Sequence, residues 1–182
     1  MTFKEFIYRE SEIAEDIMSQ VKVFAERRRL GVPTTLLDSG MQGGFVYNTT
    51  DPNMVVRIGP DTDSEHNMAD EDIQHTGGVV KIYAIAEFKG EAGSQLASWK
   101  ERVDENVEGF LYRAYTGEQR SEIFSVLSGL YHVNREGIKV LKKYPATKGL
   151  ADAIMAGLSV SDLDISLNLG FTKDGRIVAF DS

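Results

Sequence analysis

Apolar side chains near the N-terminus recur at the spacing of a helix. Four of them fall on one helical face, separated by four, four and three positions: Ile13, Ile17, Val21 and Phe24. The pattern predicts an amphipathic helix over residues 11–30. Ser11 followed by Glu15 favours its start, and Gly31 followed by Pro33 favours its stop.

From residue 34 the pattern changes to short β-prone runs separated by Gly, Asn, Asp and Pro, which is typical of strands joined by turns. The polar stretch Asp63–His75 interrupts these runs and is expected to form one short helix with Met68 and Ile73 directed inward. A small antiparallel sheet accommodates the runs themselves: Thr34–Leu37, Phe45–Tyr47, Met54–Ile58, Val79–Ile85 and Gln95–Trp99.

A helical period returns after Val107, and the tail then changes period again. The tail predicts a β-hairpin in which Leu167–Phe171 and Arg176–Phe180 flank a turn at Lys173-Asp174-Gly175. The helical period is carried by two groups of apolar residues: Ile123, Leu127, Leu130 and Tyr131, then Leu150, Ile154 and Leu158.

Strands and helices therefore occur in blocks, which indicates an α+β fold. A length of 182 residues suits a single domain. Within residues 1–182 we expect an N-terminal helix over 1–33, a sheet with a short helix over 34–106, and a helical part with a terminal hairpin over 107–182.

Charge and composition argue against two classes of protein, nucleic-acid-binding proteins and membrane proteins. Residues 61–110 hold 12 of the 28 acidic side chains and 4 of the 20 basic ones, which accounts for the net charge of −8. Sequence-specific nucleic-acid binding needs a basic field and is disfavoured. The chain has no cysteine and no apolar run of the roughly 20 residues that cross a bilayer, and we expect no signal sequence. We expect a cytoplasmic protein without membrane association.

Two neighbouring features suit phosphate binding. The turn between the first two predicted strands contains Gly40, Gly43 and Gly44, and glycine allows backbone N–H groups to approach phosphate oxygens closely. Arg57 then supplies a cation on an apolar run. Taken separately, the first is a hairpin turn and the second a solvent-facing cation.

The C-terminal run is rich in hard oxygen ligands of the kind that Mg²⁺ prefers. Asn168 precedes the predicted hairpin and Asp181 follows it, thirteen positions later. Asp162 and Asp164 lie just before Asn168.

Taken in order, these pieces resemble the protein-kinase-like superfamily over residues 34–182, and in particular the very small kinase-like proteins of bacteriophages. Gly40 to Tyr47 is similar to the glycine-rich loop, Arg57 stands where the strand-three lysine would be, and Asp63–His75 is similar to a shortened αC helix. The strongest likeness is the spacing from Asn168 to Asp181, which resembles that from the catalytic-loop asparagine to the metal-binding aspartate.

The resemblance implies a minimal kinase-like fold and a two-part nucleotide site. The glycine turn and Arg57 would hold ATP phosphates, with Glu71 or Glu65 as the helix partner of the cation and Glu101 near the hinge. Asn168 and Asp181 would hold Mg²⁺, and either Asp162 or Asp164 would accept the proton of the acceptor hydroxyl.

The chain also departs from the family pattern. Arginine replaces lysine at residue 57, and a planar guanidinium is not a conservative exchange at a phosphate site. Asp162 and Asp164 lie six and four positions before Asn168, whereas the family spacing is five. Ser182 follows Asp181, so most of the C-terminal lobe, including the activation segment, is missing from this sequence.

These departures favour a kinase-like module with a degenerate active site that binds a partner protein, in the manner of a phage factor regulating a protein in the host cytoplasm. The partner would contact the acidic segment 61–110 or the helical face of 107–158. A minimal phosphotransferase dependent on ATP and Mg²⁺ is the alternative, and an unrelated α+β interaction domain is the third. The pattern leaves the oligomeric state open.

Overall fold

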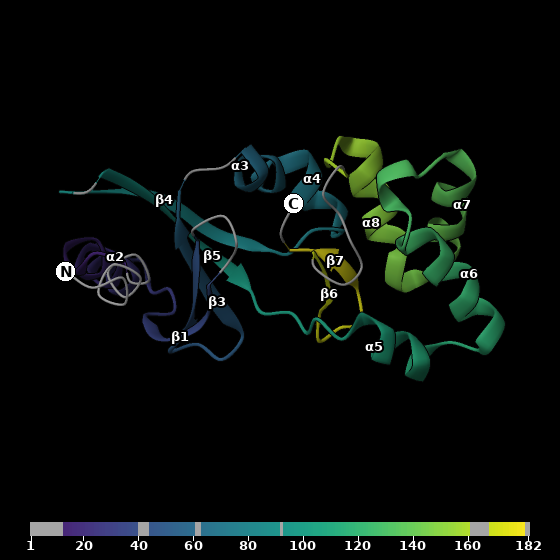
Figure 1. Cartoon of the computed structure of the whole chain (residues 1–182), viewed down its shortest axis with the longest axis horizontal. Coiled ribbons are helices and arrows are strands. Elements are labelled where there is room, and N and C mark those ends of the chain that lie inside the picture. The colour runs from purple at the N-terminus through teal and green to yellow at the C-terminus, as the bar shows by residue number, and fades with distance from the viewer. Residues whose placement is uncertain (1–12, 40–43, 61–62, 92, 161–167, 181–182) are drawn as a thin grey trace, which may run out of the picture. The chain divides into compact units, whose positions relative to one another are not determined.

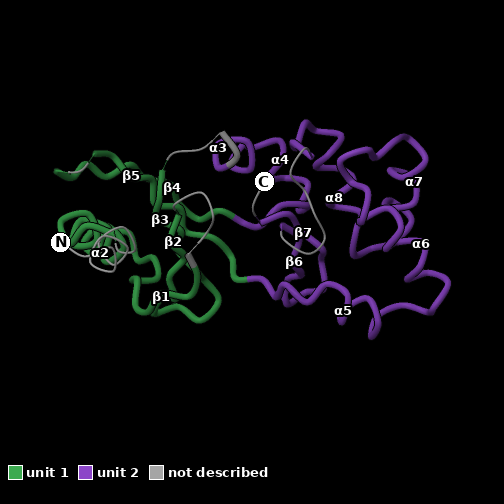
Figure 2. The backbone as a smooth tube through the Cα atoms, viewed as in Figure 1, with its two compact units in different colours: residues 1–61, 82–102 green, residues 62–81, 103–182 purple. Residues whose placement is uncertain are grey.

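The computed structural model describes residues 13–39, 44–60, 63–91, 93–160 and 168–180, except for the side chains of Ser39, Asp63 and Ser64. The described chain is α+β, as the sequence predicts (Figure 1). It forms two compact units, of which unit 1 comprises Met1–Asp61 and Ile82–Arg102, and unit 2 comprises Thr62–Lys81 and Val103–Ser182 (Figure 2). The short helical segment after residue 62 therefore groups with the C-terminal part of the chain rather than with the sheet.

Unit 1 is a five-stranded antiparallel sheet covered on one face by a helix (Figure 1). The strand order is β1-β2-β3-β5-β4, so the last strand in sequence lies between β3 and β4. The elements are α2 (Glu15–Arg28), β1 (Pro33–Ser39), β2 (Phe45–Thr49), β3 (Met54–Gly59), β4 (Ile82–Gly90) and β5 (Gly93–Glu101).

The core of unit 1 fills the space between α2 and the sheet. Ile17 and Val21 of the predicted helical stripe are buried there, which confirms the amphipathic helix. Trp99 of β5 is fully buried, packs against the ring of Phe24 at 5.4 Å between centroids, and donates from Nε1 to the Gly31 carbonyl at 2.9 Å. Trp99 is therefore a packing residue of the unit 1 core.

The end of α2 differs from the predicted stop. The helix ends at Arg28, and Arg29 takes the left-handed conformation (φ 57°) while its N–H meets the carbonyls of Ala25 and Glu26. Gly31 has a different role, because a β-carbon there would lie 2.2 Å from Thr49 Oγ1. The expected start at Ser11 lies outside the described residues.

Unit 2 combines short helices with a terminal hairpin (Figure 1). Its elements are α3 (Asp63–Ala69), α4 (Glu71–Thr76), α5 (Val107–Ala114), α6 (Gly117–Leu127), the 3₁₀ helix η1 (Leu130–His132), α7 (Arg135–Lys143), α8 (Pro145–Ala156), β6 (Leu169–Phe171) and β7 (Ile177–Ala179).

A backbone crossing joins α4 to α8 inside unit 2. A β-carbon on Gly78 would lie only 2.1 Å from the carbonyl oxygen of Gly149 and 2.5 Å from the nitrogen of Leu150. Because main chain meets main chain here, a side chain at residue 78 has no space to occupy. The glycines at 78 and 149 thus bring the end of α4 close to α8.

Most apolar positions of unit 2 behave as the periodicity predicts. Met68 and Ile73 are buried, and so are Ile123, Leu127, Leu130, Leu150 and Leu158. Two positions depart from the pattern. Tyr131 is 56% exposed, because α6 ends at Leu127 and the chain turns into η1 before that residue, and Ile154 of α8 is only half-buried.

Two predicted elements have different bounds. The single helix expected over 63–75 is broken at Asp70, whose carboxylate caps α4 by accepting from the backbone N–H groups of Asp72 and Ile73. The strand expected from Val79 begins at Ile82, because Val79 instead forms a parallel bridge with Ala179 next to the hairpin.

The C-terminal hairpin forms as predicted. Strands β6 and β7 pair antiparallel, with Leu169 opposite Ala179 and Phe171 opposite Ile177. The turn between them includes Gly175 at a φ of +82°, a conformation that glycine adopts without strain.

Candidate functional site

Arg57 lies on β3, on the face of the sheet opposite α2. Met54, Val56 and Ile58 of the same strand belong to the core under α2, and side chains alternate along a strand, so Arg57 points to the second face. There it sits between Val46 of β2 and Ser98 of β5 in the strand register. The side chain is 9% exposed, and its Nη1 donates to the carbonyl of Pro60 at 3.3 Å.

The guanidinium of Arg57 packs against the last glycine of the predicted phosphate loop. A β-carbon on Gly44 would lie 2.8 Å from Nη2 and 2.9 Å from both Cζ and Nε of Arg57. The β-carbon position of Gly44 is almost equally far from these three bonded atoms, which is possible only above their plane. The flat face of the guanidinium therefore packs against Gly44. The structure thus brings together two features that the sequence offers separately, while Gly40 and Gly43 lie outside the described residues.

A second cation, Lys100, shares the face of Arg57. Lys100 alternates with the buried core residue Trp99 and pairs in register with Val55, which places it diagonally from Arg57. It is 5% exposed. The sequence pattern did not single out Lys100. Its spacing of two residues from Ser98 at the end of a β-prone run does predict that the side chains of Lys100 and Ser98 lie on the same face of a strand.

Glu101, the expected hinge residue, ends β5 and is half-buried. It pairs in register with Met54 and therefore lies on the other face from Arg57. The pKa of the Tyr83 hydroxyl is raised, first by burial and then by the negative charges of Glu101 and Asp51.

The two glutamates considered as helix partners of the cation lie in different environments. Glu65 belongs to α3 and is 1% exposed, whereas Glu71 is an exposed residue in the first turn of α4. Burial thus distinguishes two residues that the sequence left equivalent.

Asn168 lies at the open end of the hairpin in unit 2. Its carbonyl accepts a hydrogen bond from the N–H of Phe180 at 3.0 Å, so Phe180 is directly opposite Asn168. Asp162, Asp164 and Asp181 lie outside the described residues. Within the described ranges, no group of three or more His, Asp or Glu side chains could hold a metal ion.

The turn of the same hairpin carries a carboxylate with two partners. Asp174 accepts from Arg176 Nε at 2.8 Å and from the hydroxyl of Thr172. These bonds, the one from Arg176 first, lower the pKa of Asp174. Arg176 also donates to the carbonyl of Gly77 at 3.0 Å, which ties the turn to the end of α4.

Replacing Asp174 with asparagine is expected to lower the melting temperature modestly at neutral pH. A carboxylate whose folded-state pKa is depressed stabilises the protein above its unfolded pKa, and this contribution is lost as the pH falls through the folded pKa. The side chain is 64% exposed, so the effect is at most about 1 kcal/mol. Thermal unfolding from neutral to acid pH checks it, with exposed Glu91→Gln as control. A difference between Asp174→Asn and wild type that does not change with pH contradicts the assignment.

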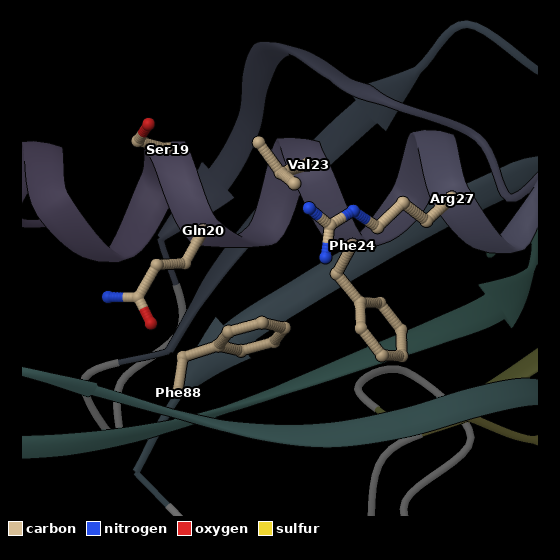
Figure 3. A pocket seen from close by; sticks show the side chains of 6 residues that line it. All are labelled: Ser19, Gln20, Val23, Phe24, Arg27 and Phe88. Carbon is tan, nitrogen blue, oxygen red and sulfur yellow. The ribbon is translucent and has the colours of Figure 1, made fainter.

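An open pocket of about 350 Å³ lies on the α2 side of the sheet, away from the Arg57 face. Five residues of α2 line it together with Phe88 of β4, and Phe24 and Phe88 meet edge to face at its floor (Figure 3). The residues are Ser19, Gln20, Val23, Phe24, Arg27 and Phe88.

The sequence matches no protein-family model, and no curated protein matches it. No helix in the described part of the chain is long and apolar enough to cross a membrane. Function is therefore inferred from the arrangement of residues within each unit.

Proposed function

We propose that the chain is a reduced kinase-like module that binds ATP with Mg²⁺ and acts by binding a partner protein, with phosphoryl transfer weak or lost. The observation that carries this proposal is the packing of the Arg57 guanidinium on Gly44. A cation placed against a glycine turn offers a phosphate group both a counter-charge and closely approachable backbone N–H groups.

The position of Arg57 in unit 1 supports the kinase-like interpretation. It occupies the third strand of a five-stranded antiparallel sheet and follows the glycine turn in the chain. In protein kinases the phosphate-binding lysine stands on the third strand after the glycine-rich loop.

The same contact supports impaired catalysis. Phosphoryl transfer depends on positioning and charge neutralisation, and the planar fork of arginine replaces a mobile point charge. The fork is held between Gly44 and the Pro60 carbonyl, so it has little freedom to follow a phosphate that moves during transfer.

Asn168 and Asp181 are the residues that would hold Mg²⁺. The carbonyl of Asn168 and the N–H of Phe180 pair across the end of the hairpin, and Asp181 is the next residue in the sequence. A carboxamide and a carboxylate oxygen suit a hard cation.

The partner is expected to be a protein, in keeping with the resemblance to phage kinase-like proteins, and a host protein is the natural choice. The helical segment 107–158 exposes Tyr112 and Tyr131 at 60% and 56%. Exposed aromatic side chains are enriched in protein interfaces.

Nucleotide binding is expected to raise the melting temperature of the wild-type protein. A ligand that binds only the folded state stabilises it by mass action, so millimolar ATP with Mg²⁺ should shift the transition upward. Arg57→Met should abolish the shift, and Arg113→Met, which removes an exposed cation of α5, should retain it. A folded wild-type protein whose melting temperature does not respond to ATP contradicts nucleotide binding.

A working phosphotransferase is the second candidate, and the backbone pairing of Phe180 with Asn168 at the open end of the hairpin supports it. Incorporation of labelled phosphate into the protein or a casein-like acceptor decides between the two. Incorporation by wild type that Asp181→Ala abolishes establishes the enzyme. Binding of ATP without incorporation establishes the module.

A further inference from the structure

The face of the sheet that carries Arg57 is more basic than the kinase resemblance requires. Lys100 lies diagonally from Arg57 on the neighbouring strand, and diagonal residues are about 7–8 Å apart, within reach of two long side chains. Both are buried, at 9% and 5% exposed. Two cationic side chains that lie close together on one face can both donate to the same anionic group.

A buried hydroxyl lies next to both cations in the register. Ser98 pairs with Arg57 across β3 and β5, and lies two residues before Lys100 on the same face. The residue is 1% exposed, and its Oγ has no hydrogen-bond partner in the part of the chain that the structure describes. A buried hydroxyl without a partner is costly and therefore rare, which points to a ligand that completes it.

We propose that Lys100 and Ser98 bind the phosphate chain of the nucleotide together with Arg57, so that the second cation of the site comes from β5. This inference rests on the proposed nucleotide binding and names the residues that hold the phosphates. A phosphate oxygen accepts from the arginine fork, the lysine ammonium and the serine hydroxyl at once, since all three are donors. Lys100, two residues beyond the register partner of Arg57, then supplies a flexible ammonium group beside the rigid guanidinium.

The sheet geometry makes Ser98 the most informative position. Alanine there removes the orphan hydroxyl without touching a hydrogen bond, so the ligand-free protein should melt at a higher temperature than wild type. The same substitution should weaken phosphate binding. A purely structural serine does not give these two opposite effects.

Calorimetric titration with ATP, inorganic tripolyphosphate and adenosine tests the proposal. Lys100→Met should weaken the binding of ATP and of tripolyphosphate by about tenfold or more, as the loss of a charged hydrogen bond does. The affinity for adenosine should stay unchanged. Ser98→Ala should weaken the same two ligands by a smaller factor. Lys22→Met, which removes an exposed cation of α2 on the opposite side of the sheet, is the matched control and should bind as wild type.

The outcomes separate the two proposals. If wild type binds ATP and both β5 variants bind it equally well, the role of Lys100 and Ser98 is refuted while nucleotide binding stands. If wild type binds tripolyphosphate but not ATP, and both β5 variants bind tripolyphosphate more weakly, the phosphate-binding role of Lys100 and Ser98 is supported and nucleotide binding is refuted. If wild type binds neither ligand, both are refuted. Should Lys100→Met fail to fold, the affinity of Ser98→Ala for ATP and tripolyphosphate decides between these outcomes.

Discussion

Alanine at position 78 is expected to destabilise the protein by about 3 kcal/mol or more, the upper end of the range for overpacked sites. The added β-carbon would lie 2.1 Å from the Gly149 carbonyl oxygen and 2.3 Å from its carbon. These are main-chain atoms, so no change of side-chain rotamer relieves the contact, and the end of α4 must move away from α8. The loss should appear as a lower urea midpoint with an unchanged slope.

The matched control for this change is Gly117→Ala. The nearest atom to a β-carbon there is Arg120 Nη2 at 3.8 Å, which is ordinary contact. Gly117 begins α6, where alanine favours the helix more than glycine does. Equal stability of the two alanine variants would show that the crossing of α4 and α8 is looser than the structure has it.

Truncating Trp99 to alanine is expected to cost about 3–5 kcal/mol of folding free energy. The indole is fully buried at the centre of the unit 1 core, and its removal leaves a cavity under α2. It also leaves the Gly31 carbonyl without the hydrogen bond from Nε1. Loss of far-UV circular dichroism on heating measures the change.

Trp99→Phe separates the two contributions. Phenylalanine retains most of the packing against Phe24 but cannot donate to Gly31, so it should cost less than half as much as alanine. If phenylalanine is as damaging as alanine, the hydrogen bond rather than the core volume determines stability here.

Elements with a strong local period were predictable. The stripe of α2 and the turn chemistry of the C-terminal hairpin both formed where the sequence placed them. The break at Asp70 was also encoded locally, since an aspartate before two acidic residues is a good helix cap, but the longer polar stretch hid it.

The wrong strand boundary at Val79 has a long-range cause. Val79 is β-prone, yet its partner is Ala179, one hundred residues away, and no local period reveals such a pairing. Here a tertiary contact decided between conformations that the local sequence allowed.

The candidate site was predictable only in part for the same reason. The glycine turn and Arg57 stood out as separate motifs, and the pairing of β2 with β3 brings Gly44 of that turn next to Arg57. Lys100 did not stand out, because the face on which a strand cation lies depends on the register with its neighbours. Glu65 and Glu71 could be distinguished only once the burial of each was known.

The strand order of unit 1 has a consequence for synthesis on the ribosome. β3 is made early, but the strand that pairs with its open edge is β5, whose Glu101 lies opposite Met54. Until residue 101 emerges, the nascent chain presents an unpaired β3 edge, the kind of surface that recruits stray strands. A chaperone that shields this edge until β5 has been made should therefore raise the yield of correctly folded protein.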